Sequence, residues 1–205
     1  MPERQILMVV TGAADPARAD RSGLNGASLT GPRAMLTEAG ANVCVASPRE
    51  RELDADDGEV LNAYSLEVVW EDDFDGILVA GGPGALVDLP DNPLLISLIE
   101  RSIRGGRPVA AVAEGVTAWV GCKTADGGAL VQNRRLTCPA EDEATSEAPF
   151  DLADRLRQLG AILDRADPGH IHVLEDDGLI SGQNRESALE AARRLVATLD
   201  YSGSE

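Results

Sequence analysis

The chain has 205 residues, of which 43% are hydrophobic, so it is long enough to bury the core of one sizeable domain. Its 35 acidic residues outnumber 18 basic ones and give a net charge of −17, which would repel nucleic acid and anionic membrane surfaces. The three cysteines form no C-x-x-C pair, which favours neither a disulfide framework nor a zinc site. No apolar run approaches the roughly 18 residues that span a bilayer, and the first residues lack a signal-peptide pattern. We therefore expect a cytoplasmic protein that binds neither nucleic acid nor membrane.

Short apolar runs alternate with helical patterns along the chain. The runs predict strands at 5–11, 42–46, 76–80 and 108–112, with shorter strands at 135–138, 171–174 and 179–181. Helices are expected at 32–39, 93–104, 150–159 and 185–199, a long loop at 12–27, and a charged excursion at 49–57. This alternation predicts an α/β fold with a parallel sheet covered on both faces. No repeat or linker divides the chain, so we expect a single domain over 1–205.

The clearest candidate for a functional site is the turn after the strand at 108–112. Ligands of parallel α/β sheets bind beyond the carboxyl ends of the strands, so the loops that follow Thr11, Ala80 and Ala113 are expected to converge. The segment 111–115 has the small-x-nucleophile-x-small pattern that lifts a nucleophile into a cleft. Ala113 stands at the nucleophile position, and its methyl group cannot attack a substrate.

Several motifs, in the same order along the chain, resemble the DJ-1/PfpI superfamily, which has the class I glutamine amidotransferase-like fold. They lie at 73–84, 88–92, 109–112 and 179–184. Within the superfamily, the chain is most similar to the heat-shock chaperone and glyoxalase branch. The resemblance implies a flavodoxin-like three-layer α/β sandwich with a mostly parallel sheet, which is often a homodimer and needs no cofactor.

The chain departs from this family at the positions that carry its chemistry. Family sites use a cysteine in the turn, frequently a histidine after it, and a glutamate from the first loop that hydrogen-bonds the cysteine. The resemblance maps these positions onto Ala113, Glu114 and Ser28, and it maps a histidine of the glycine-rich turn onto Pro83. A laboratory Cys→Ala change would explain Ala113 but neither Glu114 nor Ser28, which favours natural loss of the thiol mechanism.

Glu114 is the strongest remaining candidate for catalysis. A nearby helix N-terminus would favour its anionic form, whereas burial would raise its pKa and suit it to acid/base work. The alternative is a structural carboxylate that caps amides or pairs with an arginine. Ser28 is a second candidate, as a hydrogen-bonding group for a ligand or for Glu114. The backbone amides of Gly82, Glu114 and Gly115 are expected to form an anion-binding niche, as the family uses these positions.

Two further residues are candidates for contact with a ligand. Trp119 lies a turn beyond Ala113, and packing is favoured over stacking on a substrate. Cys138 is the best surviving thiol, but we expect it to be buried, with a pKa raised by Glu141 and Glu143. The acidic stretch 141–147 is otherwise expected to be a solvated loop.

Histidines are scarce in the chain. His170 and His172 would share a face of the strand expected at 171–174, and His170 is a candidate for the mouth of the pocket. Two ligands without a third do not predict a metal site.

Three functional hypotheses follow. The first is an enzyme without a cofactor that acts on a small polar or carbonyl-containing molecule by acid/base chemistry through Glu114, of the lyase, hydratase, isomerase or cyclase type. The second is a pseudoenzyme, a homodimer that binds a ligand or acts as a chaperone. The third is an engineered, inactive form of a glyoxalase or hydrolase, with alanine in place of cysteine at 113. The candidate pocket residues are Gly82, Pro83, Ala113, Gly115, Trp119, Cys138 and His170.

Overall fold

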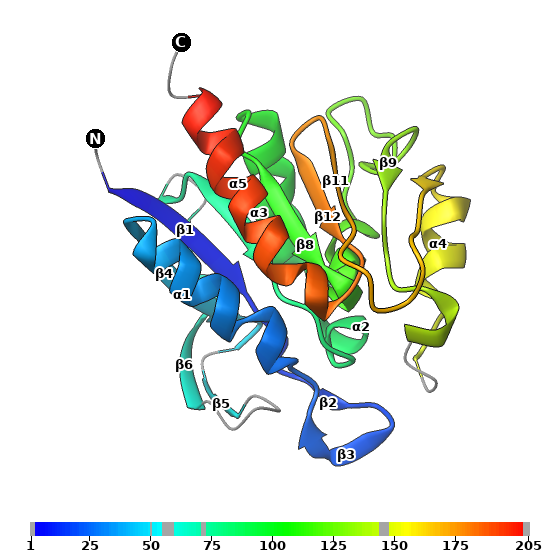
Figure 1. Cartoon of the computed structure of the whole chain (residues 1–205), viewed down its shortest axis with the longest axis horizontal. Helices are drawn as coiled ribbons and strands as arrows, with labels where there is room; N and C mark the ends of the chain where they lie inside the picture. Colours follow the sequence, from blue (N-terminus) through cyan, green and yellow to red (C-terminus); the bar gives the residue numbers. More distant parts are fainter. Residues whose placement is uncertain (1–2, 50, 55–59, 71–72, 144–147, 203–205) are drawn as a thin grey trace.

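The structure, a computed structural model, describes residues 3–49, 51–54, 60–70, 73–143 and 148–202. Within these ranges, an eight-stranded sheet runs through the centre in the order β11-β12-β8-β7-β1-β4-β6-β5 (Figure 1). Its parallel strands are β1 (Arg4–Val9), β4 (Ala41–Ser47), β6 (Val60–Ser65), β7 (Gly76–Val79), β8 (Val109–Val112) and β12 (Leu179–Gly182). The antiparallel strands β5 (Arg51–Asp54) and β11 (Val173–Asp176) close its two edges.

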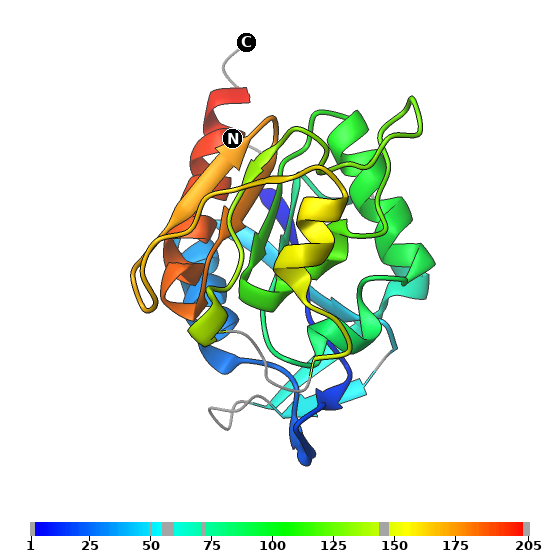
Figure 2. The same cartoon turned by 90° about the vertical axis from the view of Figure 1, so that its right-hand side faces the viewer.

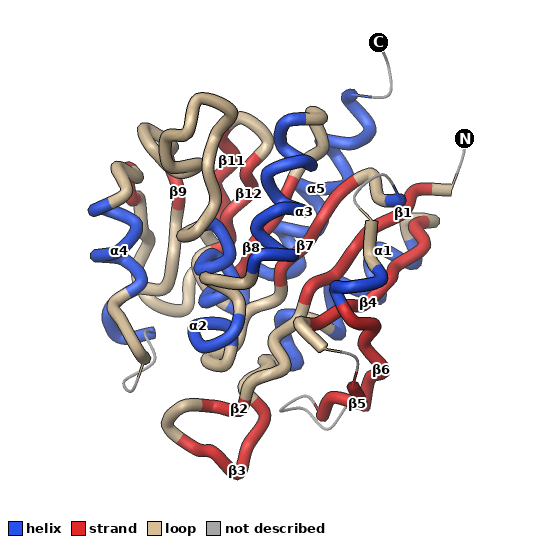
Figure 3. Tube along the Cα trace, turned by 180° about the vertical axis from the view of Figure 1, so that it is seen from behind, coloured by secondary structure: helices blue, strands red, loops and turns tan. Residues whose placement is uncertain are grey.

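Helices cover both faces of the sheet and form the two outer layers. The first layer contains α1 (Thr30–Glu38) and α5 (Ala188–Ser202). The second contains α2 (Ala85–Asp88), α3 (Pro93–Arg104) and the 3-10 helix η4 (Ala113–Trp119), as Figure 3 shows from behind. The short helix α4 (Leu152–Gln158) lies outside the second layer, beside the small parallel pair β9 (Arg135–Leu136) and β10 (Ile162–Leu163), and faces the viewer in Figure 2. The predicted α/β three-layer sandwich is confirmed.

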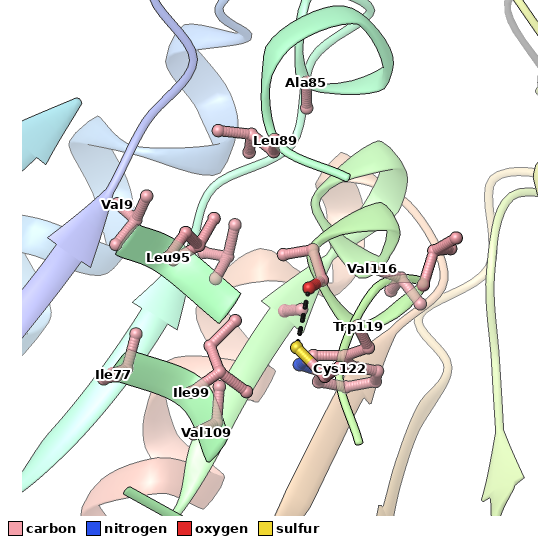
Figure 4. Packing of buried hydrophobic residues seen from close by; sticks show 14 of the residues in the cluster. Val9, Ile77, Ala85, Leu89, Leu95, Ile99, Val109, Val116, Trp119 and Cys122 are labelled. Atoms are coloured by element: carbon pink, nitrogen blue, oxygen red, sulfur yellow. Dashed lines mark hydrogen bonds between the residues drawn. The ribbon is translucent and has the colours of Figure 1, made fainter. Parts of the chain in front are cut away.

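The central strands form where the sequence carries continuous apolar runs. All four residues of β8 are fully buried, as are Ile6 to Val9 of β1, because helices cover both sides of the sheet. On the α3 side, Ile99 lies beside Val109 and Leu95 lies near Val9, and all of them share one buried cluster with Trp119 (Figure 4). This core includes residues of both β8 and η4, and it therefore fixes the turn between them.

Helix α3 begins as the sequence predicts. The Asn92 side chain accepts hydrogen bonds from the Leu94 and Leu95 amides at 3.1 and 3.0 Å, and Pro93 takes the first helical position. The helix ends before Gly105, which is its C-terminal cap.

Two predictions about irregular chain are wrong. The charged excursion at 49–57 contains β5, which pairs with a strand absent from the prediction, β6; residues 50 and 55–57 of it lie outside the described ranges. The loop at 12–27 contains the hairpin of β2 (Ala14–Asp15) and β3 (Arg18–Ser22) and most of the 3-10 turn η1 (Gly26–Ser28). The strands β3 and β5 carry mainly charged and polar residues, so backbone pairing rather than apolar periodicity defines both pairs.

Smaller differences affect the C-terminal third. The strand predicted at 171–174 begins only at Val173, so His170 and His172 lie in the preceding loop and do not share a strand face. The segment predicted as a strand at 135–138 contributes only β9, which belongs to the small pair rather than to the main sheet. The helix predicted at 185–199 consists of the 3-10 turn η6 (Arg185–Ser187) followed by α5.

Helices within the described residues are too short or too polar to cross a bilayer.

Candidate functional site

The turn between β8 and η4 has the backbone geometry of a nucleophile elbow, although no nucleophile is present. Ala113 has φ of 50°, in the left-handed region that costs a non-glycine residue about 1–2 kcal/mol. Neighbouring glycines make room for this turn. A Cβ on Gly115 would lie 2.7 Å from the Val79 carbonyl oxygen, and one on Gly81 would lie 2.8 Å from the Ala113 methyl group. Close backbone packing against the end of β7 therefore holds Ala113 in its strained conformation.

Glu114 connects this turn to the loop after β7. Its Oε2 accepts a hydrogen bond from the Gly82 N–H at 3.1 Å. Glu114 thus occupies the Gly82 N–H, which we expected to belong to an anion-binding niche. This contact corresponds to the alternative role of Glu114, a structural carboxylate that caps amides. Glu114 is partly buried and lines two adjoining cavities.

The loops after β1, β7 and β8 converge as the sequence predicts. The Asn25 N–H donates to the Gly81 carbonyl at 3.2 Å. Asp88 accepts from the Thr11 hydroxyl at 2.7 Å and from the Gly12 N–H at 2.8 Å. Burial raises the pKa of Asp88, while these hydrogen bonds oppose that shift. The first loop is therefore fixed against the chain around α2.

Two cavities of about 360 Å³ each meet at Glu114 and Pro139. The first, which we call the polar cavity, is lined by Asn25, Ala113, Glu114, Pro139, Glu143, Gly169, Asn184, Arg185 and Glu186. The second, which we call the α4 cavity, is lined by Leu86, Glu114, Pro139, Glu141, Ala148, Phe150, Asp151, Leu152, Ala153, Asp154, Arg157 and Arg165. Both are of the size that holds small molecules.

One wall of the polar cavity is built around Glu143. Its carboxylate accepts from the amides of Ala140 at 3.0 Å and Gly169 at 2.7 Å, and from the side chains of Gln183 at 3.0 Å and Asn184 at 2.8 Å. Although partial burial opposes ionisation, these donors hold the pKa of Glu143 below its usual range. The acidic stretch at 141–147 is thus not wholly a solvated loop, and residues 144–147 lie outside the described ranges.

The variant E143Q is expected to lower the melting temperature at pH 7, because a glutamine would turn an NH₂ group toward donors. Since the folded-state pKa of Glu143 is lowered, its stabilising contribution is present above the unfolded-state pKa of about 4.3 and is lost as pH falls through the folded-state value. The stability difference between wild type and E143Q should therefore shrink below about pH 4. Thermal melts from pH 3 to 8 test this, with the exposed neighbour E141Q as control. A difference that is constant with pH would contradict it.

Ser28, which the sequence placed in the site, is fully buried and lines neither cavity. Its hydroxyl has no hydrogen-bond partner within the described part of the chain. The same holds for the Asn25 side-chain oxygen, and Asn25 does line the polar cavity. Sequence reasoning missed Asn25 because a single asparagine in a loop carries no distinctive pattern.

Trp119 packs in the hydrophobic core, as the favoured interpretation predicted. It is fully buried, in the same hydrophobic cluster as Leu95 and Ile99 of α3 (Figure 4), and lines neither cavity. A ligand in either cavity would not stack on its ring. Pro83 is half-buried in the turn before α2 and likewise lines neither cavity.

Cys138 precedes Pro139 in the chain but lines neither cavity, and only 1% of its surface is exposed. Burial raises the pKa of this thiol to about 11, while Arg165 and Arg157 oppose the shift and Asp151 adds to it. The expected rise is confirmed, but its predicted causes, Glu141 and Glu143, are not those that act. A thiol with this pKa is protonated at neutral pH and is a poor nucleophile.

His170 is exposed, and its backbone carbonyl accepts from Asn184 at 2.9 Å; the neighbouring Gly169, rather than His170, lines the polar cavity. His172 lies 3.7 Å from Asp164. Within the described residues, no group of three His, Cys, Asp or Glu side chains is placed to hold a metal ion.

A parallel sheet with a strained small-residue turn after β8, facing loops from β1 and β7, defines the class of DJ-1/PfpI-like proteins. Residues 22–198 match the DJ-1/PfpI family, and the chain belongs to it. A Xenopus laevis protein named glutamine amidotransferase-like class 1 domain-containing protein 1 is 30% identical over 140 residues, which cover 66% of this chain and 61% of that protein. The chain therefore matches about three fifths of the length of that relative.

One further relative and one solved structure are similar to the chain. The putative glutathione-independent glyoxalase hsp3105 of Schizosaccharomyces pombe is 28% identical over 156 residues, covering 69% of this chain and 61% of that protein. The X-ray structure of Rapid Encystment Protein 24 KDa from Francisella tularensis superposes with a TM-score of 0.88 over 96% of this chain and 99% of that one, at 24% identity. At this identity the second comparison shows a shared fold.

Proposed function

We propose that this protein is an enzyme that acts on a small polar or carbonyl-containing molecule without a thiol, with Glu114 as its acid/base. One observation carries the proposal: the Glu114 carboxylate stands next to the elbow position and lines both cavities. The resemblance to a glyoxalase supports a carbonyl compound as substrate.

The geometry around Glu114 suits proton transfer. The Gly82 N–H donates to one carboxylate oxygen of Glu114, which fixes the orientation of the group at the edge of both cavities. A carboxylate in this position can remove a proton from the carbon next to a carbonyl and return it elsewhere on the molecule. This step is common to lyases, hydratases, isomerases and cyclases. Ala113 makes no covalent intermediate, so no acyl-enzyme or thiohemiacetal forms.

Proton exchange in D₂O tests the proposal without knowledge of the final product. We expect the protein to catalyse deuterium uptake at the carbon next to the carbonyl in at least one member of a panel of small aldehydes, ketones and oxo acids, followed by ¹H NMR. Heat-denatured protein is the control. The absence of catalysed exchange or product formation across the panel would count against an enzyme.

The second candidate is a ligand-binding pseudoenzyme with a chaperone-like role. The observation that favours it is the engagement of the Gly82 N–H by Glu114, which withdraws an amide that the family-like niche would need. This candidate predicts binding in the polar cavity with no proton exchange, so the same NMR experiment separates the two. The homodimer and the cytoplasmic location expected from the sequence stay predictions.

A further inference from the structure

The α4 cavity combines an apolar wall with a basic residue. Leu86, Phe150 and Leu152 supply hydrophobic surface, and Arg165 lines the same space. The half-buried Arg165 guanidinium donates through Nη1 to the Pro139 carbonyl at 3.2 Å. Pro139 is one of the two residues common to both cavities, so this contact holds the guanidinium near their junction.

The other charged groups around this cavity are held by different partners. Arg157 and Asp154, which also line the cavity, pair with each other at 2.8 Å. Asp151 caps α4 by accepting from the Asp154 N–H at 2.8 Å, and Glu114 accepts from Gly82.

Within the described residues, Arg165 forms no ion pair, and its side-chain hydrogen bond goes to the Pro139 carbonyl. Glu141, the remaining carboxylate of the cavity, is exposed. A guanidinium presents five N–H donors in a planar fork that matches a carboxylate. Arg165 thus retains donors for an anionic group on a ligand. Arg165 lies in the loop after β10, and its charge acts on the buried Cys138 thiol, which places the guanidinium on the protein side of the cavity.

We propose that Arg165 binds a carboxylate of the substrate in the α4 cavity, so that the substrates are small carboxylic acids with a short apolar chain and a carbonyl group. This rests on the proposed function for the part of the molecule that reacts. The carboxylate lies at Arg165, the apolar chain lies against Leu86 and Phe150, and the carbonyl lies toward Glu114. The repulsion between the ligand carboxylate and Glu114 favours this orientation over the reverse one.

Calorimetric titration tests the proposal with two probes, 4-methyl-2-oxopentanoate and its neutral methyl ester. The wild-type protein is expected to bind the acid at least about tenfold more tightly than the ester, in line with a charge-assisted hydrogen bond to an arginine. This comparison needs no variant and no turnover. Equal affinities, or no binding of the acid at millimolar concentration, would overturn the proposal.

Variants then locate the binding group. R165Q is expected to lose about tenfold in affinity for the acid and little for the ester, and R165K to keep part of the preference. R155Q is the matched control, since Arg155 lies exposed on α4, lines neither cavity and gives the same change in net charge. A folded R165Q that keeps the wild-type preference would overturn the proposal. E114Q should keep the preference for the acid, so a failure of the acid/base assignment is distinguishable from a failure of this site.

Discussion

Replacement of Glu114 by glutamine is expected to lower the rate of catalysed proton exchange by about 10²–10⁴-fold, the usual contribution of general acid/base catalysis. The side-chain oxygen of glutamine can still accept the Gly82 hydrogen bond, so the loops around Ala113 should keep their arrangement. An amide, however, cannot take up the proton. The measurement is the exchange rate of wild type and E114Q on the same carbonyl substrate, with melting temperatures to confirm the fold.

The control for this experiment is E38Q, which makes the same change of charge at an exposed residue of α1 that lines neither cavity. It is expected to exchange at a rate close to wild type. The variant E114D keeps a carboxylate but shortens its reach by one methylene, and should give an intermediate rate. An exchange rate for E114Q equal to that of wild type would remove Glu114 from the mechanism.

The second large effect is expected on stability. Gly82 has φ of 145°, and a Cβ at this position would lie 2.2 Å from the Gly23 carbonyl oxygen and 2.6 Å from the Asn25 nitrogen. Both contacts are with backbone atoms, which cannot rotate away as a flexible side chain can. G82A should therefore lower the free energy of unfolding by about 3 kcal/mol or more, the sum of backbone strain and overpacking. Urea denaturation at fixed pH measures it.

Gly31 provides the matched control for G82A. It lies in α1 with no atom within 4 Å of an added Cβ, so G31A should stabilise the protein by about 0.5–1 kcal/mol through higher helix propensity. The same substitution is thus expected to have opposite effects at two glycines. A G82A variant as stable as wild type would mean that the first loop does not depend on close approach to Gly82.

The sequence predicts the centre of the fold well and its edges poorly. Strands such as β1 and β8 are buried on both faces, so their continuous apolar runs identify them. The edge pair of β5 and β6 has no such run; in the sequence, only charge and polarity mark the stretch from 51 to 54. The pairing of such strands depends on their neighbours in space, so the sequence pattern alone does not predict it.

Some features of the candidate site could likewise be predicted from the sequence, and others could not. The turn at Ala113, the neighbouring Glu114 and the convergence of the loops follow from local patterns and from the direction of the strands. The roles of Glu143 and Arg165 do not, because they depend on partners distant in the sequence. Glu143 contacts Asn184, 41 residues away, and Arg165 contacts Pro139, 26 residues away.

The strained turn at Ala113 has a consequence for how this fold acquires new chemistry. Close packing of Gly81 and Gly115 maintains the left-handed backbone even though the residue within it carries only a methyl group. The backbone conformation of the turn therefore does not depend on a reactive side chain at position 113. Any side chain introduced at position 113 would be delivered to the polar cavity by the main chain, beside a carboxylate that is already oriented. The side chain at position 113 can therefore be replaced, in evolution or by design, while the surrounding backbone stays as it is.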